Sequence, residues 1–174
     1  MNIVLCGFMG CGKTTVGRLL AQSLGYTFVD MDDYIEKKAG MKVSEIFAAQ
    51  GEAAFRRMET EACRELSAES GLVIATGGGA LVQPGNREIL AAGGVIVLME
   101  VSPETVAHRL KDDHTRPLLD VPDKQAAIRE LMGKRLPIYR SVASIIVDGN
   151  RPAGVVAAEI RNACKFYIDK KAGL

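Results

Sequence analysis

The segment GFMGCGKT, from Gly7 to Thr14, constrains the fold of this chain more than any other feature. It matches the pattern G-x-x-x-x-G-K-[ST] in full, which is typical of loops that bind the phosphates of a nucleotide. Glycines let the backbone wrap closely, so that successive N–H groups face the phosphate oxygens. In such a loop Lys13 supplies a charge for the β- and γ-phosphates, and Thr14 supplies a hydroxyl for Mg²⁺.

The residues around this loop have the arrangement that phosphate binding requires. An apolar run, residues 2–7, precedes the loop. An amphipathic helix that ends at Gly25 follows it, with the positive end of the helix dipole toward the loop. The apolar positions of that helix are Val16, Leu19, Leu20 and Leu24. The residues that we expect to contact a nucleotide here are Gly10, Cys11, Gly12, Lys13, Thr14 and Thr15.

Five short apolar runs, several of them nearly continuous Val, Ile and Leu, alternate with helical patterns along the chain. They occupy residues 2–7, 26–30, 72–76, 94–101 and 144–149. Such runs are typical of strands that are buried on both faces of a parallel sheet. Strands that alternate with helices predict an α/β domain with right-handed crossovers, and a length of 174 residues favours a single domain.

Boundary signals place further helices and one loop. Apolar residues recur at helical spacing from Phe55 to Leu66, and Gly71 is the expected end of that helix. Ser102 followed by Pro103 predicts a capped helix start. Pro152 opens a last helix, expected to carry inward Val155, Val156, Ile160 and Cys164. Residues 111–124 combine charges with prolines and a short apolar patch, which predicts a mobile surface loop.

Composition narrows the classes of function. The formal net charge is +1, which argues against a large basic surface for nucleic acid. The four cysteines have no metal-ligand spacing and form no disulfide framework. The N-terminus begins on an apolar run without a basic region, and no apolar run approaches the roughly 20 residues of a membrane helix. We therefore expect a cytoplasmic protein with no membrane partner.

An acidic pair follows the second apolar run. The run at 72–76 ends without an aspartate and continues into three glycines, Gly77 to Gly79. Asp30 and Asp32 instead come at the end of YTFVDMDD, where an extended strand would project both side chains to one face. The carboxyl ends of parallel strands are where ligands bind. One carboxylate can therefore serve Mg²⁺ and the other can accept a substrate hydroxyl proton, while Asp33 is expected to cap the next helix.

Six segments in order along the chain resemble the shikimate kinase family over essentially its whole length. They are GFMGCGKTTVGR, FVDMDD, GEAAFRRMET, ATGGGA, TRPLL and KRLPIYR. The resemblance implies a three-layer α/β/α fold of the nucleoside-monophosphate-kinase type, within the P-loop NTPases, with five parallel strands in the order 2-3-1-4-5. It implies one kinase domain over 1–174, with a substrate-binding segment at about 31–62 and a mobile lid at about 111–124.

The same resemblance implies the reaction and the partners. The γ-phosphoryl group of ATP would pass to the 3-hydroxyl of shikimate, giving shikimate 3-phosphate and ADP in chorismate and aromatic amino-acid biosynthesis. One Mg²⁺ ion would accompany ATP, with Thr14 and Asp30 beside it. The protein would bind ATP and shikimate, no nucleic acid and no membrane, and would be a monomer.

Site residues are carried over from the family position by position. Asp32 matches the aspartate that anchors the shikimate hydroxyls and is the candidate base. The residues matched to the shikimate carboxylate and ring are Arg56, Arg135, Gly77, Gly78 and Gly79. Arg116 matches the lid arginine that reaches the phosphates, and with Lys13 and Asp32 it completes the catalytic set. Arg109 falls where the family has an arginine against adenine, and Arg151 lies near the adenine loop.

Several neighbouring residues have two interpretations. Glu59 is expected to pair with Arg56 and orient it, whereas Arg57 is expected to be a solvated charge or a partner of Glu61. Phe47 and Phe55, with Val43, wall the substrate ring or simply belong to the core. His108 and His114 are expected at the surface.

Three other functions compete with this one. The nearest is a kinase of the same fold that acts on gluconate or on a nucleoside monophosphate. The combination of the Gly77–Gly79 turn, the aspartate pair and two separated arginines opposes it. A regulatory module that lost catalysis is opposed by the presence of Lys13, Asp32 and both arginines. A structural or nucleic-acid-binding role is opposed by the charge balance and the absence of an aromatic platform.

Overall fold

The structure is a computed structural model that describes residues 1–172. Its centre is a five-stranded sheet in which every strand pairing is parallel, with the order β2-β3-β1-β4-β5. The strands are β1 (Asn2–Cys6), β2 (Thr27–Asp30), β3 (Leu72–Ala75), β4 (Gly94–Glu100) and β5 (Ile145–Asp148). The expected α/β class and strand order are confirmed.

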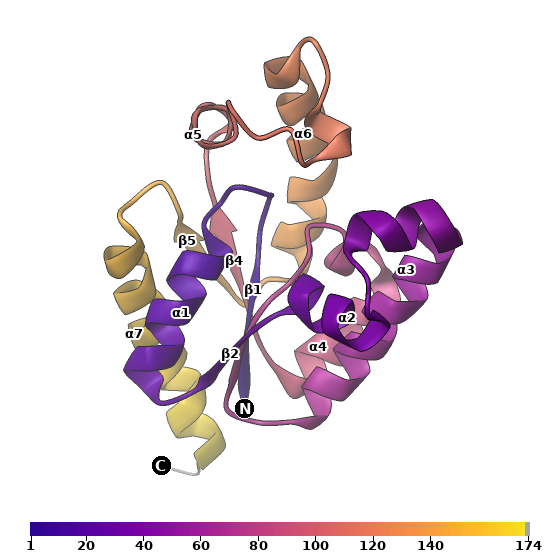
Figure 1. Ribbon diagram of the computed structural model, residues 1–174. Helices are drawn as coiled ribbons and strands as arrows, with labels where there is room; N and C mark the ends of the chain where they lie inside the picture. Colours follow the sequence, from indigo (N-terminus) through magenta and orange to yellow (C-terminus); the bar gives the residue numbers. More distant parts are fainter. Residues whose placement is uncertain (173–174) are drawn as a thin grey trace.

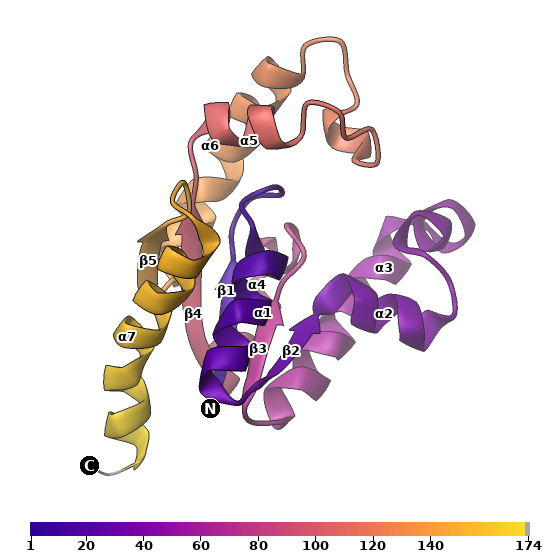
Figure 2. The same ribbon diagram turned by 60° about the vertical axis from the view of Figure 1, so that its left-hand side comes forward.

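Helices cover both faces of this sheet (Figure 1). One face is covered by α1 (Lys13–Leu24) and α7 (Ala153–Ala172), and the other by α3 (Val43–Ala68) and α4 (Pro84–Gly93). The remaining elements are α2 (Met31–Ala39), α5 (Pro103–Arg109), α6 (Lys124–Val142) and two short 3₁₀ helices, η1 (Ala80–Val82) and η2 (Pro117–Leu119). Figure 2 shows α5 and the loop after it above the sheet, with α2 and the start of α3 projecting to one side.

The central strand explains why the sheet has two buried faces. Alternate residues of a strand point to opposite faces. Ile3 and Leu5 accordingly pack in the apolar cluster that includes α1 and α7. Val4 and Cys6 pack in the second cluster, which includes α3 and α4. Because both faces are apolar, the sequence of this strand reads as a continuous run and not as an alternation.

Two helices present narrower apolar faces than the sequence pattern indicates. In α1 the buried residues are Val16, Gly17, Leu20 and Ala21, while Leu19 is 40% exposed. In α7 Val156, Ile160 and Cys164 are buried as expected, but Val155 is exposed. Both exceptions lie one residue before a buried position, about 100° away around the helix, so they fall outside the face that meets the sheet.

The end of α3 lies earlier than the expected end at Gly71. The helix stops at Ala68, because the buried side chain of Asn2 binds the backbone that follows. Its Nδ2 donates to the carbonyls of Leu66 and Glu69, each at 3.0 Å, and its Oδ1 accepts from the N–H of Leu72 at 3.1 Å. One side chain at the start of β1 therefore ends α3 and starts β3.

The middle of α3 and the segment expected as a lid each have a distinctive backbone conformation. Within α3, Gly51 has φ 82° and ψ 171°, so the helix is kinked between Phe47 and Phe55. The segment expected as a lid, 111–124, has η2 as its regular element before α6 begins. Leu119 of η2 is buried, and the Lys124 ammonium donates to the carbonyls of Leu110 (2.9 Å) and Asp113 (2.7 Å). These contacts fix both ends of the segment.

Candidate active site

The P-loop joins β1 to α1 at the carboxyl edge of the sheet. Gly7, Gly10 and Gly12 have φ angles of 147°, 77° and 94°, which side chains other than glycine rarely adopt. The Lys13 ammonium donates to the carbonyls of Gly7 (2.8 Å) and Phe8 (3.2 Å). The Lys13 side chain therefore folds back across the loop. Its ammonium group and the N-terminus of α1 both bring positive charge to the loop.

Three further residues of the predicted nucleotide site differ in their exposure. Cys11 is buried, and its Sγ lies 3.5 Å from the Lys13 ammonium, so it packs beneath the loop as a small residue. Thr15 is exposed in the first turn of α1. Thr14 is also exposed, and its hydroxyl donates to Asp30 Oδ2 at 3.2 Å.

The acidic pair does not lie on an extended strand, which corrects the sequence prediction. β2 ends at Asp30 and α2 begins at Met31, so Asp32 is in the first turn of a helix. Asp30 itself is the N-cap, since its Oδ1 accepts from the N–H groups of Asp32 (3.0 Å) and Asp33 (3.4 Å). The expectation that Asp33 is the cap is therefore wrong. The carboxylate of Asp30, three residues earlier, already occupies that role.

Asp32 is half-buried beside charges of both signs. Burial raises the pKa of its carboxyl group, and the neighbouring Asp30 charge raises it further. Lys13 and Arg116 oppose this shift. A carboxylate whose pKa is raised holds protons more strongly than an ordinary aspartate does, which suits a group that accepts a proton from a substrate.

The turn of three glycines after β3 lies against three different predicted site residues. A Cβ atom added to Gly77 would lie 2.9 Å from Asp32 Oδ1, and one added to Gly78 would lie 3.1 Å from Arg135 Nη1. A Cβ atom added to Gly79 would overlap the Arg56 guanidinium. Side chains therefore occupy the space beside each glycine, so glycine is needed here for close approach.

The Arg56 guanidinium is held by two carboxylates. Arg56 Nη1 donates to Glu59 Oε2 at 2.9 Å, and Nη2 donates to Glu52 Oε1 at 3.2 Å. The expected Arg56–Glu59 pair is thus confirmed. Burial raises the pKa of Glu59, while the bond to Arg56 lowers it. Arg57, in contrast, is exposed, and Glu61 lies 3.4 Å from Lys38 instead, so the Arg57–Glu61 alternative is not what the structure shows.

Aromatic residues lie near the kink of α3. The rings of Phe47 and Phe55 are 4.9 Å apart between centroids. Phe55 is buried and belongs to the core, whereas Phe47 is 38% exposed, and Val43 is half-buried. Phe47 is therefore the member of this group with a free apolar surface.

The three other arginines that the sequence predicted as site residues differ in their contacts. Arg109 donates to the carbonyls of Gly10 (3.1 Å) and Gly149 (3.2 Å), so it connects the P-loop to the loop after β5. Arg116 is exposed, and its Nε lies 3.3 Å from Asp113 Oδ2. Arg151 pairs with Asp148 and Glu159. His108 and His114 are exposed as expected.

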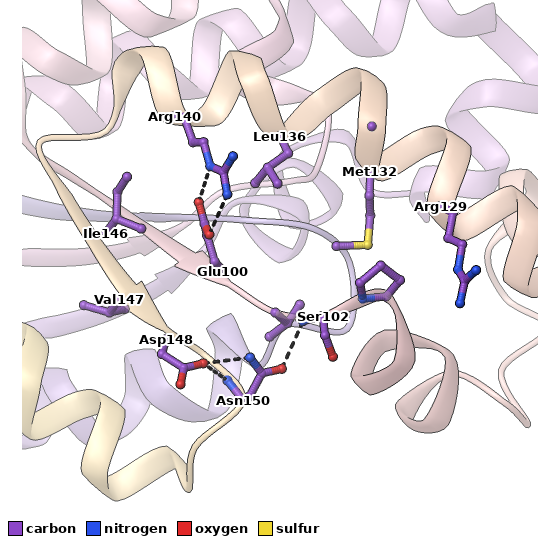
Figure 3. Close-up of a pocket in the computed structure, with 13 residues that line it drawn as sticks. Glu100, Ser102, Arg129, Met132, Leu136, Arg140, Ile146, Val147, Asp148 and Asn150 are labelled. Carbon is purple, nitrogen blue, oxygen red and sulfur yellow. Dashed lines mark hydrogen bonds and ion pairs between the residues drawn. The ribbon is translucent and has the colours of Figure 1, made fainter.

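A separate groove of about 660 Å³ lies between α6 and the ends of β4 and β5 (Figure 3). Its apolar wall includes Met132, Leu136 and Ile146. At one end Arg140 makes two bonds to the Glu100 carboxylate, at 2.6 and 3.0 Å. None of the predicted site residues lines this groove.

Residues 1–172 also bear on membrane and metal binding. No helix in this part of the chain is long and apolar enough to span a membrane. Within the same residues, no three His, Cys, Asp or Glu side chains cluster as a metal site. A metal held between Thr14 and Asp30 would therefore need ligands from a nucleotide or water, as Mg²⁺ commonly does.

The fold and this site define the class of P-loop kinases with a small substrate: a parallel sheet, a phosphate-binding loop with its lysine, and acidic and basic side chains that meet at a glycine turn beside it. The family model described as shikimate kinase matches residues 9–165. The chain therefore belongs to the shikimate kinase family, and it is an ATP-dependent kinase.

Individual relatives agree with this membership. The shikimate kinase of Aromatoleum aromaticum is 48% identical over 158 residues, which cover 90% of each chain. The solved structure of the Acinetobacter baumannii shikimate kinase in complex with shikimate has 40% identity and a TM-score of 0.83, over 99% of this chain and 93% of that one. A gluconokinase from Sinorhizobium meliloti has a TM-score of 0.57 at 16% identity, over 95% of this chain and 96% of that one, which shows the fold alone.

Proposed function

We propose that this chain transfers the γ-phosphoryl group of ATP to the 3-hydroxyl of shikimate. The observation that carries the proposal is the convergence at the Gly77–Gly79 turn. Asp32 lies beside its first glycine, Arg135 beside its second and Arg56 beside its third. A carboxylate acceptor for hydroxyls and two guanidinium groups for a carboxylate match a small polyhydroxylated acid.

The carboxylate of the substrate is bound by the two arginines. Guanidinium groups are planar, permanently charged and able to make paired bonds to a carboxylate. Arg56 and Arg135 come from α3 and α6, so a carboxylate between them is held from two elements. Glu59 fixes the Arg56 side chain before the substrate arrives, which lowers the entropy lost on binding. Phe47 offers its exposed ring to the apolar face of the substrate.

Phosphate binding and charge neutralisation are assigned to the P-loop side. The backbone of Gly10, Cys11 and Gly12, together with the Lys13 ammonium, receives the β- and γ-phosphates. Thr14 and Asp30 would hold one Mg²⁺, because their oxygen atoms are adjacent hard ligands. When bound, Mg²⁺ neutralises charge on the transferring phosphoryl group. Thr15 adds a hydroxyl beside Thr14, and Arg109 and Arg151 are assigned to the adenine side.

Asp32 orients the reacting hydroxyl and accepts its proton. Its position beside Gly77 places the carboxylate at the carboxyl edge of the sheet, within the electrostatic influence of Lys13. Arg116 reaches the phosphates when the lid, residues 111–124, closes over the P-loop. Closure excludes water and so limits hydrolysis of ATP. In the present arrangement Arg116 pairs with Asp113, and closure requires that this exposed pair exchange for phosphate oxygens.

A single kinase domain over 1–174 that works as a monomer is part of the same proposal. Residues 31–62 contribute Asp32, Arg56 and Glu59 and form its substrate-binding segment. The location of the protein in the cytoplasm stays a prediction.

Release of ADP tests the proposed function. The purified protein is supplied with ATP and Mg²⁺, and with shikimate, gluconate, AMP or no acceptor. We expect strong stimulation by shikimate alone. Stimulation by gluconate or AMP instead would agree with the proposed phosphoryl transfer at the P-loop but would overturn the assignment of shikimate as the substrate. No stimulation by any acceptor would favour the alternative hypothesis that the protein is a nucleotide-binding module without catalytic activity.

A further inference from the structure

Tyr139 lies against the same turn as the proposed carboxylate clamp, and nothing in the reaction described above uses it. It is 2% exposed near the end of α6, and its hydroxyl donates to the carbonyl of Gly78. A Cβ atom on Gly78 would lie 3.9 Å from this hydroxyl and 3.1 Å from Arg135 Nη1. Tyr139 and Arg135 are four residues apart, so they lie on the same face of α6, one turn from each other.

The bond from Tyr139 determines where neighbouring N–H groups point. A trans peptide unit is planar, with its C=O and N–H directed to opposite sides. Because the Gly78 carbonyl is held toward α6, the N–H of Gly79 is directed away from α6. Among the hydrogen bonds within residues 1–172, none has the N–H of Gly78 or Gly79 as donor. These donors are thus free for a ligand.

The hydroxyl is well suited to a permanent role as a donor. Burial raises the pKa of Tyr139 to about 12, although the nearby Arg135 charge opposes the shift. The hydroxyl therefore keeps its proton at neutral and moderately alkaline pH. A glycine turn is flexible on its own, since three successive glycines restrict the backbone little. The carbonyls of Gly77 and Gly79 accept from the N–H groups of Ala80 (3.2 Å) and Val82 (3.0 Å), and Tyr139 supplies the partner of the carbonyl between them.

We propose that Tyr139 is a positioning residue for the carboxylate end of the substrate: its hydroxyl fixes the Gly78 carbonyl, orients the Gly77–Gly79 turn and ties it to the helix that carries Arg135. The inference rests on the proposed function, because it assigns Tyr139 to the same site. We expect its effect on the acidic substrate, because the residues that lie beside the Gly77–Gly79 turn are Asp32, Arg135 and Arg56, which are assigned to that substrate.

The variant Tyr139→Phe keeps the ring and removes the hydroxyl, so it leaves the Gly78 carbonyl without its partner. We expect a rise of about five- to twentyfold in the shikimate KM and in the Kd for shikimate from calorimetry. The ATP KM and kcat stay within about twofold of wild type. A variant with unchanged shikimate KM and Kd would overturn the proposal. So would an equal loss of affinity for ATP.

Arg140→Ala is the matched control for loosening of α6. It removes the ion pair that joins the same turn of the helix to Glu100, and it does not touch Gly78. We expect it to leave the shikimate KM unchanged. A rise equal to that of Tyr139→Phe would mean that the helix position matters and the hydroxyl does not, which overturns the proposal. Shikimate-dependent ADP release by the wild type, measured alongside, separates failure of this inference from failure of the proposed function.

Discussion

The Arg56 guanidinium donates to the carboxylate of Glu59 across one turn of α3, at 2.9 Å, and Glu59 is only 1% exposed. The pair unites two demands. An arginine that must bind a substrate carboxylate needs a fixed orientation, and a buried glutamate needs a positive partner. Each residue satisfies the other, so the proposed binding of the substrate and the stability of the fold depend on the same pair.

Arg56→Ala should therefore reduce stability as well as shikimate binding. The change leaves Glu59 buried without its cation, which costs about 3 kcal/mol, or about 6–12 °C in Tm. Without Arg56 the folded-state pKa of Glu59 lies still further above its unfolded value. The loss should thus be small at acidic pH and grow as pH rises through that pKa. Thermal unfolding between pH 5 and pH 8 measures it.

The double variant Arg56→Ala, Glu59→Gln separates the two effects. It removes the unpaired charge, so we expect Tm to recover at pH 8 while the shikimate KM stays high. Recovery of both would mean that Arg56 serves only to neutralise Glu59 and does not bind the substrate.

Arg135→Ala should raise the shikimate KM about ten- to hundredfold, because a charge-assisted bond to the carboxylate is lost. The ATP KM should change little, since Arg135 lies at the Gly78 turn and not at the P-loop. Initial rates with each substrate varied in turn give both constants. Equal weakening of both substrates would contradict the carboxylate clamp.

Asp32→Asn should lower kcat by about 10²–10⁴ while the fold persists. It should also raise Tm at pH 8, by about 2–4 °C for each 1 kcal/mol recovered. The reason is that the ionised carboxylate is disfavoured by burial and by Asp30, and asparagine carries no charge. The gain should vanish at a pH low enough to protonate Asp32 in the wild type. Turnover close to that of the wild type would rule out Asp32 as the base and as the group that anchors the substrate hydroxyl.

The pH profile of kcat/KM for shikimate should fall on the acid side at a pH above the usual range for an aspartate. The pKa of Asp32 is raised, so the proton-accepting form is lost as pH decreases through a value higher than usual. Rates measured with the ATP concentration saturating from pH 4.5 to pH 9 define this limb. A profile that stays flat down to the ordinary aspartate range would rule out Asp32 as the group that titrates.

Gly79→Ala should raise the shikimate KM by at least about tenfold, because its Cβ would displace the Arg56 guanidinium. Gly133→Ala, within α6, is the matched control. Apart from its chain neighbours and the nearby backbone of α6, no heavy atom lies within 4 Å of its added Cβ, so kinetics should be unchanged and helix propensity should stabilise α6 by up to about 1 kcal/mol. Similar kinetics for the two variants would show that the turn tolerates a side chain.

Much of the fold can be predicted from local signals. The P-loop, the apolar strands, the cap at Ser102 and the end of α1 at Gly25 each depend on residues close together in the chain, and each is found where expected. The end of α3 could not be predicted in this way. It depends on Asn2, more than 60 residues away, whose amide binds the carbonyl groups at the end of that helix.

Some features of the candidate site could likewise be predicted from the sequence, whereas others could not. The P-loop with Lys13 and Thr14, the acidic pair, the three glycines and the two separated arginines can all be read from the sequence, because residue identity and spacing carry that information. The three-dimensional structure was needed to show that Asp30 caps α2, that each glycine meets a different side chain, and that Tyr139 binds Gly78. These contacts join segments that are brought together by packing against the sheet, so they leave no local signal in the sequence. Residue identity and spacing along the chain show which types of side chain are available to the site. Packing against a common sheet decides which of these side chains contact one another.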